Sequence, residues 1–220
     1  MSKTKIFGKQ WPLLAISMIA MLGSLSAQIK AITENGDEIL VFEDGTWKSQ
    51  IDNAKLFGNT VISENKTAFT KDVRSTFLLK SKLVNVGVWL NPNKWTITKG
   101  AEPQEYKFTL KGGSAYGMLI TEKVEFPLET LKKAALKNAQ NASPDITLIK
   151  EEYRVVNGTR VLMMQLEGTL QDIKFNFLGY YYSANQCSVQ LVTWTVKDLY
   201  STNIGEMETL LNGIVEVANP

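Results

Sequence analysis

The sequence contains no histidine, and this single absence excludes a large part of enzyme chemistry. Histidine is the usual general base near neutral pH, the group that activates serine and cysteine nucleophiles, and the commonest zinc ligand. Cysteine is almost as scarce: Cys187 stands alone, so no disulfide can form within the chain and no histidine can activate the thiol. We therefore expect Cys187 to be a small packed side chain. We also expect no catalytic residue, no metal site and no cofactor.

A surplus of positive charge is lacking as well. The chain has 24 lysines and arginines against 22 acidic residues, and three of those lysines lie among the first 27 residues, which leaves 21 basic residues beyond them. A nucleic-acid-binding protein is expected to carry a basic surplus. The balance therefore predicts no nucleic-acid partner. Beyond the amino-terminal segment there is no second long apolar run, so no membrane span is predicted in the mature chain.

The first 27 residues have the pattern of a secretory signal. A lysine-rich start precedes the apolar run over residues 11–22, and small residues lead up to Ala27. Such a pattern directs export and is removed by cleavage after the small residues. We predict cleavage between Ala27 and Gln28, and a periplasmic or extracellular location.

The remaining chain divides into three predicted segments. Residues 28–50 are predicted to form a β-meander, because Asn35-Gly36 and Asp44-Gly45 separate short β-rich runs and tolerate the positive φ of hairpin turns. Residues 51–76 are polar, without clear periodicity, and are predicted to be a linker. Residues 77–220 are predicted to form the main domain.

The main domain is predicted to combine two helices with many strands. Pro127 can start a helix whose apolar face includes Leu131 and Ala135, with Lys132 on the solvated side. The last helix is predicted over residues 203–217, with Asn203 as its cap. Because short turns force antiparallel neighbours, we predict an α+β fold with a predominantly antiparallel sheet flanked by helices. The four central strands are expected over residues 146–156, 159–167, 172–183 and 186–196. The third strand has apolar or aromatic side chains in both alternating sets, with Phe177 and Tyr181 in the same set, so we expect it to be buried on both faces.

Three motifs carry a resemblance to a known family. The stretch Trp89-Leu90-Asn91-Pro92-Asn93-Lys94-Trp95, the helix from Pro127 to Asn141, and the hairpin Val155-Val156-Asn157-Gly158-Thr159-Arg160-Val161 occur in this order. Over residues 85–218 the chain resembles the PsbP/DcrB-like family. The resemblance implies an α-β-α sandwich in a secreted or periplasmic accessory protein with a binding or assembly role and no shared active site. The amino-terminal stretch over residues 43–48 resembles a module of secreted Bacteroidetes proteins.

Aromatic side chains are the candidate ligand-binding residues. Aromatics in strands usually belong to the core, but in an open groove they suit a sugar, a peptide or an apolar ligand. The core interpretation is the commoner one for each of them. The candidates are Trp89, Trp95, Tyr180 and Tyr182.

Carboxylates supply the alternative chemistry, because a pair of them can hydrolyse glycosidic bonds without histidine. Glu151 and Glu152 are adjacent on one predicted strand and therefore point to opposite faces. The sequence cannot place any two carboxylates at the required separation. The candidates are Glu122, Glu125, Glu151, Glu152 and Glu167.

The function that these observations favour is that of a secreted or periplasmic non-enzymatic accessory protein, which binds a partner protein or a small ligand. One alternative is a carboxylate-dependent extracellular hydrolase. Another is a structural envelope component whose amino-terminal meander docks to another chain.

Overall fold

The computed structural model describes residues 29–32, 38–42, 44–49 and 62–217. The predicted signal and residues 51–61 of the predicted linker lie outside these residues. The amino-terminal part forms the expected antiparallel meander in the order β1-β2-β3. Gly45 has a φ of +79°, as the Asp-Gly turn requires. The strands are β1 (Ile29–Ile32), β2 (Glu38–Val41) and β3 (Trp47–Ser49).

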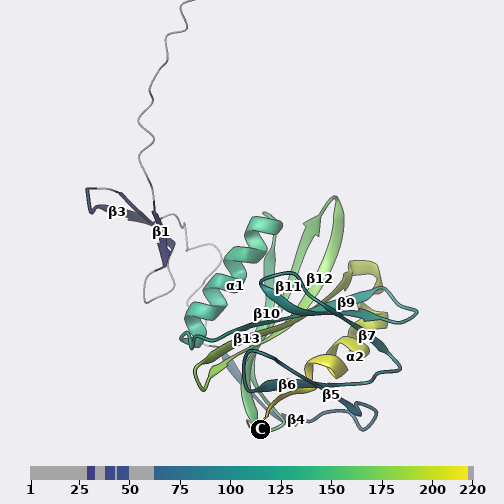
Figure 1. Ribbon diagram of the computed structural model, residues 1–220. Coiled ribbons are helices and arrows are strands. Elements are labelled where there is room, and N and C mark those ends of the chain that lie inside the picture. Colours follow the sequence, from purple (N-terminus) through teal and green to yellow (C-terminus); the bar gives the residue numbers. More distant parts are fainter. Residues whose placement is uncertain (1–28, 33–37, 43, 50–61, 218–220) are drawn as a thin grey trace, which may run out of the picture.

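The main domain is built on an eight-stranded sheet (Figure 1). Its strand order is β4-β10-β11-β12-β13-β9-β8-β7, and only the β4–β10 pair is parallel. The strands are β4 (Ser63–Phe69), β7 (Trp95–Lys99), β8 (Gln104–Leu110), β9 (Ala115–Glu122), β10 (Thr147–Val156), β11 (Thr159–Leu170), β12 (Ile173–Ala184) and β13 (Cys187–Val196).

Helices and a second sheet cover the two faces of this sheet. The helix α1 (Leu128–Ala142) lies on one face. The helix α2 (Tyr200–Leu211) and a three-stranded sheet lie on the other. The predicted α+β fold with a sheet between helices is therefore confirmed (Figure 1). The small sheet has the order β14-β6-β5 and contains β5 (Phe77–Lys80), β6 (Val86–Leu90) and β14 (Ile214–Glu216).

Strand β12 is buried on both faces, as its two apolar sets predict. Tyr180 and Tyr182 belong to the core cluster beneath α2, whereas Tyr181 belongs to the cluster beneath α1. The strand lies between β11 and β13 in the middle of the sheet. Neighbouring tyrosines thus pack on opposite faces of the sheet, because successive side chains of a strand alternate between faces.

The hairpin between β10 and β11 has the turn that Asn-Gly predicts. Asn157 has a φ of +49° and Gly158 a φ of +86°, which are the values that a tight two-residue hairpin needs. The Asn157 side chain also donates from Nδ2 to the carbonyls of Asn212 and Ile214, at 2.8 Å each. This turn therefore ties the sheet to the chain that follows α2.

Strand β4 lies within the segment predicted to be a linker. Its sequence is mostly polar and most of its side chains are exposed, because it forms one edge of the sheet. A polar edge strand has no apolar alternation for sequence reasoning to detect. It pairs in parallel with β10, so the main sheet begins at Ser63.

The predicted helix over residues 203–217 was wrong at both ends. It spans Tyr200–Leu211, and Asn203 is buried inside it, donating from Nδ2 to Thr195 Oγ1 at 2.9 Å instead of capping the helix. A Cβ on Gly213 would collide with the carbonyl oxygen of Trp89, so the chain turns there in close contact with β6. The apolar residues that follow form β14, which pairs with β6.

Candidate functional site: a cavity between α1 and the sheet

The four aromatic candidates do not gather in one groove. Trp95, Tyr180 and Tyr182 are at most 4% exposed and belong to the core cluster beneath α2. Trp89 is half-buried on β6, with the Lys71 ammonium 4.9 Å from its ring centroid. Among the described residues the Trp95 indole N–H has no hydrogen-bond partner. Ligand binding by these four side chains stays a prediction from the sequence.

Four of the five candidate carboxylates have partners of their own, and the fifth, Glu122, is exposed at the end of β9. Glu151 forms a 2.7 Å ion pair with Lys132, and both side chains are at most 10% exposed. Lys132 is therefore buried, contrary to the prediction that it lies on the solvated side of its helix. Glu167 lies 2.6 Å from the Lys197 ammonium, and Glu125 accepts a hydrogen bond from the Gln186 backbone N–H. The structure thus gives these carboxylates charge and hydrogen-bond partners other than one another.

Glu152 belongs to a buried ion network beneath α2. Arg154 donates from Nε to Glu152 Oε1 at 2.7 Å and from Nη1 to the Tyr180 hydroxyl at 2.8 Å. Burial raises the pKa of Glu152, but hydrogen bonds from Asn65, Arg154 and Lys150 outweigh it and lower the pKa to about 2. Glu152 is therefore fixed in its charged form, which is the opposite of what a general acid needs near neutral pH.

Cys187 is a packed side chain, as predicted. It is 3% exposed, and its thiol donates to the Ala184 carbonyl at 3.1 Å. Burial raises the pKa of this thiol. A nucleophilic cysteine needs a lowered pKa, so its environment argues against reactivity.

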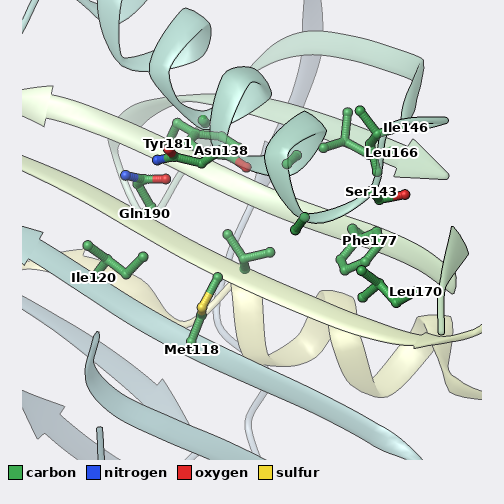
Figure 2. A pocket seen from close by; sticks show the side chains of 14 residues that line it. Met118, Ile120, Asn138, Ser143, Ile146, Leu166, Leu170, Phe177, Tyr181 and Gln190 are labelled. Carbon is green, nitrogen blue, oxygen red and sulfur yellow. The ribbon is translucent and has the colours of Figure 1, made fainter. Parts of the chain in front are cut away.

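A cavity of about 200 Å³ lies between α1 and the sheet (Figure 2). Its volume exceeds the roughly 150 Å³ of an engineered protein cavity that binds benzene. Its wall is predominantly apolar. The lining residues are Met118, Ile120, Ala135, Asn138, Ala139, Ala142, Ser143, Ile146, Leu166, Leu170, Phe177, Tyr181, Gln190 and Val192.

The roof of the cavity is the carboxyl-terminal half of α1. Leu131 and Leu136, which come earlier in the helix than Ala139 and Ala142, are fully packed against the sheet. In the second half, the positions that face the sheet carry the small residues Ala139 and Ala142. Residues three and four apart share one face of a helix, so this alanine pair leaves a space that leucines would fill.

The floor of the cavity comes from the central strands. Tyr181 pairs in register with Gln190 on β13, and Gln190 pairs in turn with Ile120 on β9. The Tyr181 ring lies back across Gly179: a Cβ on that glycine would be 2.9 Å from the ring carbon Cε2 and 3.0 Å from the hydroxyl oxygen. Gly179 therefore leaves the room in which the Tyr181 ring lies.

Three of the four polar side chains that line the cavity lie at one end of it. Figure 2 shows Asn138, Tyr181 and Gln190 there, whereas Leu166 and Phe177 lie towards the other end. Tyr181 is 4% exposed, and burial raises the pKa of its hydroxyl, which therefore stays protonated. Within the described part of the chain, this hydroxyl has no hydrogen-bond partner. The hydroxyl can therefore both donate to and accept from a polar group that enters the cavity.

The opposite end is closed by groups that are already paired. The Ser143 hydroxyl donates to Asp145 Oδ1 at 2.7 Å and accepts from the Thr169 backbone N–H at 2.9 Å. A Cβ on Gly168 would lie 2.5 Å from Ser143 Oγ, so this glycine lets the end of α1 approach β11 closely. The Ser143 hydroxyl thus already has hydrogen-bond partners within the protein.

Sequence reasoning missed this cavity, although it placed Tyr181 and Phe177 on one side of the strand. Asn138 and Gln190 carry no motif, and only helix packing and strand register bring them to Tyr181. Among the described residues, no group of three or more His, Cys, Asp or Glu side chains could hold a metal ion. None of the helices in the described part of the chain is long and apolar enough to cross a membrane.

Comparisons with known proteins identify the fold. No protein-family model matches the sequence, and no curated protein matches it. The solution structure of cyanobacterial PsbP (CyanoP) from Synechocystis sp. PCC 6803 matches with a TM-score of 0.52 at 16% identity, over 66% of this chain and 94% of that chain. The main domain has a PsbP-like fold. The predicted resemblance is thus confirmed at the level of fold.

Two further solved structures are less similar to the PsbP-like domain. PA94, a protein of unknown function from Pseudomonas aeruginosa, matches with a TM-score of 0.41 at 9% identity, over 66% of this chain and 97% of that chain. A protein from Bacteroides thetaiotaomicron VPI-5482 matches with a TM-score of 0.40 at 9% identity, over 61% and 46%. A PsbP-like fold does not specify a function by itself, so the function has to be argued from the site.

Proposed function

We propose that this chain is an exported, non-enzymatic binding protein that takes a small ligand into the cavity between α1 and the sheet. The observation that carries the proposal is an apolar cavity of about 200 Å³ lined by Tyr181, whose hydroxyl has no hydrogen-bond partner among the described residues. Small-molecule sites are mostly apolar concavities with a few polar groups that orient the ligand. The α1 cavity has this composition.

The chemistry of the lining supports binding without turnover. Of the fourteen lining residues, Tyr181 alone carries an ionisable side chain, and burial raises its pKa away from neutrality. A general acid or base works best when its pKa is near the operating pH. The PsbP-like fold is compatible with a binding role, and the predicted signal supports export.

A pair of variants on α1 tests ligand binding. Ala139→Leu puts three additional carbons into the cavity, whereas Asn141→Leu puts the same side chain on an exposed position of the same helix that does not line it. We expect NMR titration with toluene and benzyl alcohol to detect binding to the wild type and to Asn141→Leu, and none to Ala139→Leu. Failure of both probes to bind the folded wild type would contradict the proposal.

Export has a separate test. We expect the protein from an extracytoplasmic fraction of a native-like host to begin at Gln28, as determined by mass spectrometry of the intact chain. A chain that keeps Met1 to Ala27 in that fraction would refute the predicted cleavage without affecting the cavity.

A further inference from the structure

The two ends of the cavity differ in what they offer to a ligand. At the polar end, the Tyr181 hydroxyl and the side-chain amides of Asn138 and Gln190 have no hydrogen-bond partner among the described residues. At the other end, the Ser143 hydroxyl is already bonded to Asp145 and Thr169. A ligand therefore finds hydrogen-bonding capacity at one end and an apolar wall along the rest.

The charge of the lining is zero. No lysine, arginine, aspartate or glutamate is among the fourteen lining residues. Moving an ion out of water is costly unless a counter-charge meets it. A protonated tyrosine and two amides can each both donate and accept, so they pair with an alcohol, a carbonyl or an amide without any charge.

The burial of Tyr181 at the polar end of the cavity further favours an uncharged head group on the ligand. Asn138 is exposed at the mouth of the cavity, whereas Tyr181 is 4% exposed. A head group that reaches the largely buried Tyr181 gives up part of its contact with water. A neutral group gives up little hydration on this path, whereas a carboxylate gives up much more.

The volume sets the size of the apolar body. A cavity of about 150 Å³ holds benzene, with its six carbon atoms. In proportion, the 200 Å³ of this cavity hold about eight non-hydrogen atoms. Larger drug-sized ligands occupy about 300 Å³ or more.

Resting on the proposed function, we infer that the ligand is a small neutral amphiphile: an apolar body of about eight non-hydrogen atoms with one uncharged hydrogen-bonding head group that pairs with the Tyr181 hydroxyl. The apolar body lies against Leu166 and Phe177. The head group lies between Tyr181, Gln190 and Asn138.

Three probes of similar shape test the head group. Toluene has no polar group, benzyl alcohol has a neutral one, and benzoate has a charged one. We expect NMR titration to give the tightest binding for benzyl alcohol, with toluene about fivefold weaker and benzoate at least about tenfold weaker.

Tyr181→Phe removes only the hydroxyl. Tyr200→Phe is the matched control, because Tyr200 is the first residue of α2 and packs against the core cluster on the other face of the sheet. We expect Tyr181→Phe to weaken benzyl alcohol binding about fivefold to tenfold and to leave toluene binding unchanged within about twofold. Tyr200→Phe leaves both probes unchanged. Because the Tyr181 hydroxyl has no partner in the described protein, Tyr181→Phe keeps or raises the Tm in the absence of a probe.

The outcomes separate this inference from the proposed function. If toluene and benzyl alcohol bind equally, and Tyr181→Phe changes neither, the cavity binds ligands but the head-group inference is overturned. If benzoate binds tightest, the neutral ligand class is wrong. If no probe binds the folded wild type at any tested concentration, the proposed function fails and the inference fails with it.

Discussion

Tyr180 and Tyr181 are neighbours in the chain, yet they lie in two differently built halves of the molecule. The Tyr180 hydroxyl donates to Asn212 at 2.8 Å and accepts from Arg154, within an ion network that also includes Glu208 of α2. The Tyr181 hydroxyl faces a cavity beneath the alanine side of α1. The face beneath α2, called the sealed side below, is filled by the larger apolar cluster together with this ion network, whereas the face beneath α1 contains the cavity. The comparison shows that packing, rather than residue type, decides which of two tyrosines is available to a ligand.

The largest expected effect on stability comes from disrupting the ion network on the sealed side. Arg154→Met leaves Glu152 buried without its main counter-charge, and we expect it to lower the free energy of unfolding by about 3–5 kcal/mol. Arg160→Met on the same hairpin is the control, because Arg160 pairs with Glu64 in solvent and both side chains are at least 51% exposed. That change costs at most about 1 kcal/mol. Urea unfolding measures both, and equal losses would mean that the buried network does not stabilise this face.

Truncating one leucine on each face compares their packing directly. Leu210 of α2 is 0% exposed, so we expect Leu210→Ala to lower the free energy of unfolding by about 2–5 kcal/mol. Leu170 is half-buried and borders the cavity, so Leu170→Ala should cost only about 1 kcal/mol. Thermal and urea unfolding measure the losses of stability of the two variants. A cost for Leu170→Ala as large as that for Leu210→Ala would show that the α1 face is as tightly packed as the other.

Low pH should destabilise the folded protein, because Glu152 on the sealed side becomes protonated. Its pKa is lowered to about 2 in the folded protein, from an ordinary value of 4.5. A lowered folded-state pKa stabilises the protein above the unfolded pKa, and this stabilisation is lost as the pH falls from about 5 towards 2. The shift corresponds to on the order of 3 kcal/mol.

The measurement is urea unfolding of the wild type and of Glu152→Gln from about pH 6 to about pH 2, a range that spans the ordinary and the lowered pKa of Glu152. We expect the stability of the wild type to fall more steeply than that of the variant, because glutamine does not titrate. Asp145, whose pKa is also lowered to about 2, titrates in both proteins and cancels in the comparison. Parallel pH profiles would contradict the assignment to Glu152.

The smallest expected effect is at Cys187, also on the sealed side. The thiol is buried in the core cluster beneath α2. We expect Cys187→Ser to lower the free energy of unfolding by about 1–2 kcal/mol, since it places a hydroxyl in an apolar setting, and Cys187→Ala to cost less. Probe binding in the α1 cavity should be unaffected by either change. Loss of binding in a folded Cys187→Ala variant would mean that the two faces are coupled.

The sequence correctly predicted a turn, a strand and a helix that depend on short-range patterns of residues. The Asn157-Gly158 turn followed from backbone sterics, since few residue pairs adopt two positive φ values without strain. The burial of β12 on both faces followed from two apolar sets on one strand. The helix at Pro127 followed from the spacing of Leu131 and Ala135.

The incorrect predictions concern residues whose partners in the structure lie far away in the sequence. The last helix gives way to β14 because Gly213 lies against the carbonyl of Trp89 and the following residues pair with β6. Asn203 looked like a cap, but it is inside the helix and bonds to Thr195. Lys132 looked solvated, but Glu151 on β10 pairs with it. In each case a contact between distant segments overrode the local preference.

The sequence by itself determined the class of fold, the turns, and the chemistry that the protein lacks, because composition, periodicity and backbone sterics act locally. The tertiary structure alone decided where a ligand could bind. The cavity exists because the alanines of α1 meet the strip of sheet where Gly179 lets the Tyr181 ring lie flat, beside Gln190 from the next strand. That meeting depends on helix docking and strand register, which are set by the packing of the whole core and cannot be read from any one segment.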